Sequence, residues 1–182
     1  MKRRAFLSLA TALSAAASLG ARRAHAAPAP SFTFPSVDGG MLDTGQWRGR
    51  PVLVINTASL CGFSGQLREM QTLHETYGPR GLVVLAVSSN DFNQELATGA
   101  EARAYCEMEY GIDLPMTDIL PVAKGEVHPF YGWLRQETGF VPKWNFAKVL
   151  LGPEGQILGT WGSFTRPGSG GITAGFAPYL SS

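Results

Sequence analysis

Two continuous apolar segments, residues 51–55 and 82–87, constrain the fold of this chain more than any other feature. Each has the length of a strand, and neither alternates apolar with polar residues. Continuous apolar strands are typical of sheets that are covered on both faces. A segment with helical spacing of apolar residues, 65–77, lies between them. We therefore predict a parallel strand–helix–strand unit at the centre of the fold.

Weaker patterns predict the elements around this unit. The expected order is a hairpin (31–34 and 41–42), a helical turn (42–47), two helices (98–110 and 128–136), two strands (144–151 and 157–161) and a last helix (168–179). A strand–helix–strand unit followed by a β-hairpin resembles the thioredoxin-like arrangement. We expect an α/β protein of that fold, with a central mixed sheet flanked by helices and an N-terminal β-hairpin.

A cysteine follows the first apolar strand, in the segment Asn56–Ser64, and the predicted helix begins directly after it. A helix N-terminus offers unpaired N–H groups and the positive end of the helix dipole, which favour the thiolate form of a cysteine. Cys61 is therefore a candidate reactive thiolate. A small buried apolar residue is the alternative, since free cysteine is among the most buried residue types.

The N-terminus has the features of an export signal. Residues 1–4 are basic, residues 5–19 are apolar but short for a membrane span, and Ala24–Ala26 fits a small-x-small cleavage site. The paired arginines resemble a twin-arginine signal, although Lys2 departs from that pattern. We expect a signal peptide at 1–26, a linker at 27–31 and one domain at 32–182, exported to a bacterial periplasm without stable membrane insertion.

Charge argues against a nucleic-acid partner. The N-terminal segment holds five basic residues, which leaves ten Lys and Arg against fourteen Asp and Glu in the rest of the chain. A mildly acidic domain without a basic run has no electrostatic basis for binding nucleic acid. The spacing of His25, His74, His128 and the two cysteines does not resemble a zinc site, so we expect no metal.

Four local patterns together resemble the glutathione peroxidase family. They are the cysteine segment Asn56–Ser64, the loop Asn90–Glu95, the segment Trp144–Lys148, and Tyr105–Cys106 followed by Leu114–Met116. One such motif is weak evidence, whereas four in the same order and spacing are specific. The resemblance extends from about residue 32 to residue 167. It implies a peroxidase of the thioredoxin-like fold that needs no bound cofactor.

The resemblance implies a catalytic site of Cys61, Gln94, Trp144 and Asn145. A thiolate attacks the peroxide O–O bond and becomes a sulfenic acid. No histidine lies near the cysteine in these motifs to act as its base. The indole N–H of Trp144, the amides of Gln94 and Asn145 and backbone N–H groups would then stabilise the thiolate and the leaving oxygen.

Cys106 bears on the reductant. Members of the family with a cysteine here use it to resolve the sulfenic acid as an intramolecular disulfide, which a thioredoxin-type dithiol reduces. The resemblance therefore implies a thioredoxin-type partner and makes glutathione the less expected reductant. Because a disulfide needs Cα atoms within about 7 Å, we expect the helix 98–110 to unwind locally after oxidation. A buried cysteine without a partner is the alternative reading of Cys106.

The loop Asn90–Glu95 and the residues before it depart from the family pattern. Ser88 and Ser89 stand where Pro-Cys is usual, Asp91 where Gln is usual, and Asn93 where Gly is usual. These differences put the orientation of Gln94 in doubt. The chain also lacks room for the oligomerisation insertion of tetrameric members. We therefore expect a monomer with a compact site that accepts hydrogen peroxide and organic or lipid hydroperoxides.

Three other functions compete with a peroxidase. A thiol–disulfide oxidoreductase would carry Cys-x-x-Cys at the turn, but Ser64 occupies the second cysteine position. A copper-delivery redoxin would need two nearby thiolates with His or Met. Position 65, where a second cysteine would follow Cys61, is glycine. A peroxide-sensing thiol protein without turnover would share every residue of the site. Turnover with a dithiol reductant distinguishes the enzyme from the sensor.

Overall fold

A computed structural model describes residues 29–182. The predicted signal peptide at 1–26, its cleavage site and the first residues of the linker lie outside the described residues. Every helix within the described part is too short or too polar to cross a membrane.

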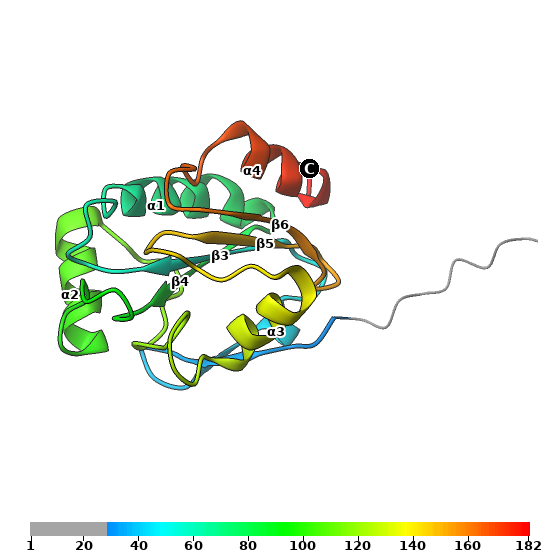
Figure 1. Ribbon diagram of the computed structural model, residues 1–182. Helices are drawn as coiled ribbons and strands as arrows, with labels where there is room; N and C mark the ends of the chain where they lie inside the picture. Colours follow the sequence, from blue (N-terminus) through cyan, green and yellow to red (C-terminus); the bar gives the residue numbers. More distant parts are fainter. Residues whose placement is uncertain (1–28) are drawn as a thin grey trace, which may run out of the picture.

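A four-stranded mixed sheet in the order β4-β3-β5-β6 forms the centre of the fold (Figure 1). The first two apolar segments are β3 (Val52–Thr57) and β4 (Val83–Ser88), which pair in parallel and are buried along their whole length. The hairpin of β5 (Lys148–Leu151) and β6 (Ile157–Trp161) continues the sheet, with β5 antiparallel to β3. The predicted strand–helix–strand unit and the mixed sheet are confirmed.

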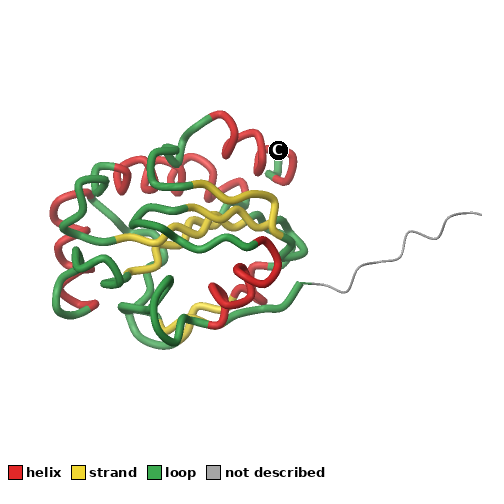
Figure 2. The backbone as a smooth tube through the Cα atoms, in the orientation of Figure 1, coloured by secondary structure: helices red, strands yellow, loops and turns green. Residues whose placement is uncertain are grey.

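Helices cover both faces of this sheet, which explains why its central strands are apolar without alternation (Figure 2). On one face, α1 (Gln66–Tyr77) and α4 (Gly170–Phe176) pack with Leu53 and Ile55. On the other face, α3 (Pro129–Thr138) packs with Val52 and Val54. The sheet thus separates two apolar cores.

The N-terminal hairpin is present as β1 (Thr33–Pro35) and β2 (Met41–Asp43), which form a separate two-stranded sheet. Three short 3-10 helices follow along the chain, at Thr44–Trp47, Gly78–Arg80 and Ala177–Tyr179. The first is the helical turn predicted at 42–47.

The helix α2 (Gly99–Tyr110) stands at one end of the sheet (Figure 1). Its start is defined by a capping box, in which Thr98 and Glu101 bond each other's backbone N–H groups. Only Gly99, Ala102 and Cys106 of its twelve residues are buried. The helix therefore buries a narrow apolar face, to which the half-buried Tyr105 and Tyr110 add.

The prediction of a strand over 144–151 is wrong in its first half. Strand β5 begins at Lys148, and residues 144–147 form a turn. Phe146 has a left-handed backbone (φ 63°), which a strand cannot accommodate. The apolar and aromatic composition of this segment resembles a strand, but its backbone bonds to Asn56, as described below.

Candidate active site

Cys61 lies in the turn between β3 and α1, with only 3% of its surface exposed. Its sulfur accepts a hydrogen bond from the backbone N–H of Phe63 (3.5 Å). Hydrogen bonds from Cys61 N to Ala58 O (3.4 Å) and from Ser64 N to Cys61 O (2.9 Å) hold the turn. The sulfur therefore faces the N–H groups that precede α1, as the sequence predicts.

The loop after β4 brings Gln94 to this turn. The Leu60 N–H donates to the Gln94 carbonyl (2.9 Å), and the Asn145 side-chain amide donates to Gln94 Oε1 (3.1 Å). Asn93 has a left-handed backbone (φ 56°). Glycine adopts this conformation without strain, and asparagine tolerates it better than most residues. This explains how Asn93 replaces the glycine that is usual in the family.

Asp91 anchors the same loop, although the sequence alone indicated only a departure at this position. Its Oδ2 accepts three successive backbone N–H groups, from Val122 (2.8 Å), Ala123 (2.6 Å) and Lys124 (3.1 Å). Phe92 next to it packs against the indole of Trp144, with ring centroids 5.2 Å apart. Asp91 therefore fixes this loop to residues 122–124.

Glu95 is a buried carboxylate that sequence reasoning missed, although it ends the loop motif. It accepts hydrogen bonds from Ser59 N (3.1 Å), Leu96 N (2.9 Å) and Ser88 Oγ (2.6 Å). A buried charge is tolerated where several donors satisfy it. Glu95 therefore ties the end of β4 to the Cys61 turn, and Ser88, where proline is usual, supplies one of the donors.

Asn56 is a second missed residue, and it positions the Trp144–Asn145 pair. Its side chain donates to Trp144 O (3.2 Å) and accepts from Ala147 N (2.9 Å). Phe146 N donates to the Asn56 carbonyl (2.6 Å). These bonds satisfy the turn that replaces the expected strand. Asn56 lies near the end of β3 and begins the cysteine motif, and this position was the sequence signal that could have identified it.

The structure brings Gln94 and Asn145 into contact, and Trp144, next to Asn145 in the chain, packs with its ring tilted against Phe92. Trp144 is 40% exposed, whereas Asn145 is fully buried. Among residues 29–182, no side-chain hydrogen bond joins Gln94, Trp144 or Asn145 to the sulfur of Cys61. Polar contacts of an active site often tighten only when substrate is bound.

Cys106 lies on α2, in the same apolar core as Cys61, and both thiols are free. Its sulfur is 4.0 Å from Ser59 Oγ, two residues before Cys61. Burial raises the pKa of the Cys106 thiol to about 11, opposed by the hydrogen bond with Ser59. While α2 is intact, Cys106 is therefore protonated at neutral pH and is a poor nucleophile.

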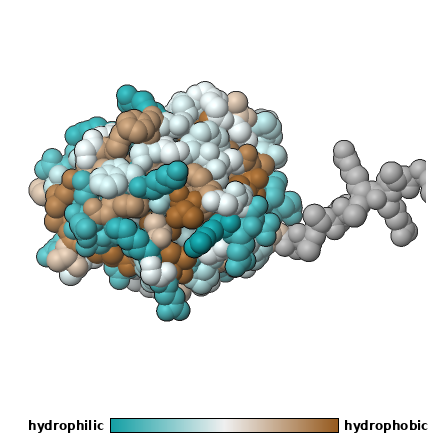
Figure 3. Space-filling view, viewed as in Figure 1, coloured by the Kyte–Doolittle hydropathy of each residue, from teal (hydrophilic) through white to brown (hydrophobic). Residues whose placement is uncertain are grey.

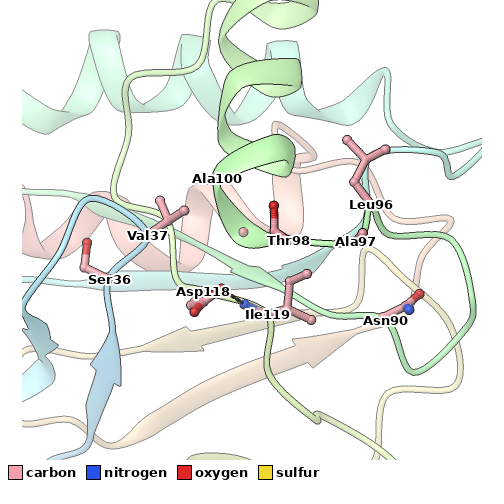
Figure 4. Close-up of a pocket in the computed structure, with 10 residues that line it drawn as sticks. Ser36, Val37, Asn90, Leu96, Ala97, Thr98, Ala100, Asp118 and Ile119 are labelled. Atoms are coloured by element: carbon pink, nitrogen blue, oxygen red, sulfur yellow. Dashed lines mark hydrogen bonds between the residues drawn. The ribbon is translucent and has the colours of Figure 1, made fainter.

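Two open clefts lie at this part of the surface, one beside the loop after β4 and one beside Trp144. One, of about 530 Å³, borders the start of α2 and is lined by residues that include Asn90, Thr98 and Asp118 (Figure 4). The other, of about 650 Å³, lies beside Trp144 and includes Phe140, Val141 and Phe164. Apolar side chains also reach the surface in separate patches between polar ones on the face seen in Figure 3.

No group of three or more His, Cys, Asp or Glu side chains is arranged to hold a metal ion within the described part of the chain. The chemistry available at this corner is that of a thiol with one backbone N–H donor at its sulfur and with amide and indole groups on the adjoining loops.

A thioredoxin-like fold with one cysteine at its strand-to-helix turn, and with the Gln94–Asn145 amide pair attached to that turn, indicates the thiol peroxidase class. A family model described as glutathione peroxidase matches residues 31–135. The chain belongs to the glutathione peroxidase family. It is a peroxidase of the oxidoreductase class that uses cysteine chemistry to reduce peroxides.

Similar proteins come from several organisms. The chain is 33% identical to a glutathione peroxidase of Lactococcus lactis, over 75% of this chain and 90% of that protein. The hydroperoxy fatty acid reductase gpx1 of Synechocystis is 31% identical (75% and 87%). The glutathione peroxidase-like peroxiredoxin HYR1 of Saccharomyces cerevisiae is 32% identical (68% and 80%).

The structure is also similar to solved structures. The crystal structure of Trgpx in its apo form superposes with a TM-score of 0.61 at 29% identity, covering 83% of this chain and 96% of that one. The predicted thioredoxin-like fold is confirmed.

Proposed function

We propose that Cys61 is the peroxidatic residue of this enzyme. Its sulfur attacks one peroxide oxygen and the O–O bond breaks. The sulfur keeps that oxygen as a sulfenic acid, and the other oxygen leaves as water or an alcohol after taking up the thiol proton. The convergence of the Cys61 turn, the Gln94–Asn145 pair and Trp144 at one corner of the sheet is the observation that supports this assignment.

In this proposal, neutral hydrogen-bond donors stabilise the negative charge on the sulfur and on the departing oxygen. The Phe63 N–H already donates to the sulfur, and it stabilises negative charge there. In this proposal the Gln94 and Asn145 amides and the Trp144 indole bind the departing oxygen once a peroxide is present. The hydrogen bond between Leu60 N and the Gln94 carbonyl, which attaches this loop to the Cys61 turn, supports that role. Preorganised donors act strongly here because the site is largely buried.

Cys106 is the resolving residue in this proposal. Its thiol attacks the sulfenic sulfur of Cys61, a disulfide forms and water leaves. The two Cα atoms must come within about 7 Å. The sparse burial of α2 supports local unwinding of this helix, because few apolar contacts are lost when it opens. Opening also exposes Cys106 to water and removes the burial that raises its pKa.

A thioredoxin-type dithiol then reduces the Cys61–Cys106 disulfide. The presence of Cys106 and the similarity to a yeast protein named as a peroxiredoxin support this reductant over glutathione. The test is steady-state hydrogen peroxide reduction with either a reduced thioredoxin or glutathione. We expect sustained turnover with the dithiol and much slower turnover with glutathione. Stoichiometric oxidation of Cys61 without turnover by either reductant would instead identify a peroxide sensor.

Substrates include hydrogen peroxide and organic hydroperoxides in this proposal. The apolar cleft of about 650 Å³ beside Trp144 supports the bulkier ones, because it offers a place for a hydrocarbon group next to the site. The Synechocystis relative is named a hydroperoxy fatty acid reductase, which supports the same class of substrate.

We also propose that the domain at 32–182 acts as a monomer in a bacterial periplasm. The basic start, apolar stretch and small-x-small site of residues 1–26 support export. Because the periplasm is oxidising, the reductant there must itself be kept reduced by another system. Fractionation of cells that express the full chain checks the compartment.

Tyr110 offers a test of α2 opening. Its hydroxyl donates to Ser64 Oγ (2.7 Å), which ties the last residue of α2 to the Cys61 turn. Tyr110→Phe removes one hydrogen bond, and we expect disulfide formation to accelerate about threefold because the helix opens more readily. The measurement is the rate of disulfide formation after one equivalent of peroxide, followed by acid quenching and mass spectrometry.

The control is the preceding step, oxidation of Cys61, which should keep its wild-type rate in Tyr110→Phe. A disulfide that forms more slowly in this variant would contradict the proposed opening of α2.

A further inference from the structure

Lys148 is a buried cation to which the proposed mechanism gives no role. It is the first residue of β5 and is fully buried. Its ammonium group donates to Gln66 Oε1 (2.5 Å) and to the Ser163 carbonyl (3.3 Å). Both acceptors are neutral. Burying a charge on neutral partners is unfavourable for stability, which raises the question of what this one does.

The two acceptors belong to segments that meet at the Cys61 turn. Gln66 is the first residue of α1, and its Nε2 donates to the same Ser163 carbonyl (2.8 Å). The Gln66 backbone N–H donates to Phe63 O (2.9 Å). The ring of Phe164 packs edge-on against that of Phe63, at 5.2 Å. Each of Lys148, Gln66 and Ser163 is thus hydrogen-bonded to the other two, and this network is attached to Phe63 through Gln66.

Other charged groups at this corner pair with each other. Glu69 on α1 and Arg166 in the loop after β6 form an ion pair. Burial lowers the pKa of Lys148 to about 8, and the nearby charge of Glu69 opposes that shift. Lys148 therefore carries its proton at neutral pH and loses it in the mildly alkaline range.

We propose that Lys148 is a positioning residue, whose ammonium group joins Gln66 to Ser163 and thereby holds the Phe63 N–H against the Cys61 sulfur. This inference rests on the proposed role of Cys61. Lys148 does not touch the reacting atoms. It acts through the first turn of α1, where a small displacement weakens a donor that must be aligned with the sulfur.

The inference predicts opposite effects of pH on reactivity and stability. Above about pH 8 the ammonium loses its proton and its hydrogen bonds weaken, so each Cys61 thiolate reacts more slowly. This shows as a decline in the rate constant divided by the thiolate fraction. In the unfolded chain, Lys148 has its ordinary pKa of 10.5. Between these values the unfolded state binds more protons, so the contribution of Lys148 to folding stability rises with pH. A purely structural lysine would not lower reactivity while raising stability.

The test compares Lys148→Met with wild type in a Cys106→Ser background, which isolates the first chemical step. We measure the rate constants for Cys61 with hydrogen peroxide and with iodoacetamide from pH 6 to 9.5 and divide each by the thiolate fraction, which the ultraviolet absorbance of the thiolate gives in this background, where Cys61 is the remaining cysteine. We expect Lys148→Met to react about tenfold more slowly at pH 7 and to lose the decline above pH 8. Arg135→Met, at an exposed basic residue on α3, is the control for charge and should react as wild type.

Two further variants keep the test decisive if Lys148→Met folds poorly. Gln66→Glu supplies a carboxylate acceptor, which should move the alkaline decline to higher pH because it favours the charged lysine. Lys148→Arg should retain part of the rate. A decline that stays in place in Gln66→Glu, or a wild-type profile in folded Lys148→Met, would overturn the inference.

The two proposals fail differently. If peroxide leaves Cys61 unoxidised in wild type, the proposed function fails, whereas the iodoacetamide profile still reports on Lys148. If peroxide oxidises Cys61 with the same profile in all variants, only the role of Lys148 fails.

Discussion

Cys61→Ser is expected to abolish peroxide reduction, with a loss of turnover on the order of 10³-fold or more. A serine hydroxyl fills nearly the same volume, but at neutral pH it keeps its proton and does not attack an O–O bond as a thiolate does. Neither Gln94, Trp144 nor Asn145 offers a replacement nucleophile. The measurement is hydrogen peroxide consumption with a reduced thioredoxin in excess.

Folding is the necessary control for this variant. Cys61 lies in an apolar core at 3% exposure, so the new hydroxyl carries a modest desolvation penalty. Circular dichroism and thermal unfolding should show a native protein. Substantial residual turnover in folded Cys61→Ser would mean that Cys106 or another group performs the first step.

Cys106→Ser is the second large effect, and it should separate the two halves of the cycle. We expect one equivalent of peroxide to be reduced at the wild-type rate, after which turnover with thioredoxin stops. The reason is that sulfenic acid on Cys61 then has no internal thiol to form the disulfide that a dithiol recognises. Stopped-flow measurement of the first turnover, followed by trapping of the sulfenic acid and mass spectrometry, checks both steps.

Reduced wild type provides the comparison. Because burial raises the pKa of Cys106 to about 11, we expect brief alkylation at pH 7.5 to label Cys61 and to leave Cys106 unmodified. After α2 is unfolded in denaturant, both should react. Full multiple turnover by Cys106→Ser with thioredoxin would remove the resolving role from this residue.

The central architecture could be read from the sequence because its signals are local. The apolar segments that form β3 and β4 lack alternation, and sheets covered on both faces produce that pattern. The helical spacing over 98–110 predicted α2 in the same direct way, and the structure places its start at Gly99. Cys61 could be placed before the structure was known, since it follows a strand and precedes a helix.

The turn at 144–147 could not be predicted from local sequence patterns. Its composition favours a strand, but Asn56, about ninety residues earlier, supplies bonds that stabilise a turn with a left-handed Phe146. Propensity is a weak guide where distant groups satisfy the backbone. The same limit applies to Asp91, whose three backbone donors lie more than thirty residues away in sequence.

The sequence by itself determined the strand–helix–strand unit, the position of Cys61 at its turn and the family to which the motifs belong. Only the tertiary structure decided that Gln94 and Asn145 touch, that Glu95 and Asn56 hold the loops around the turn, and that Lys148 lies buried beneath it. The physical reason is that periodicity and turn chemistry act between neighbours in the chain. Hydrogen-bond partners and burial depend on how distant segments pack together.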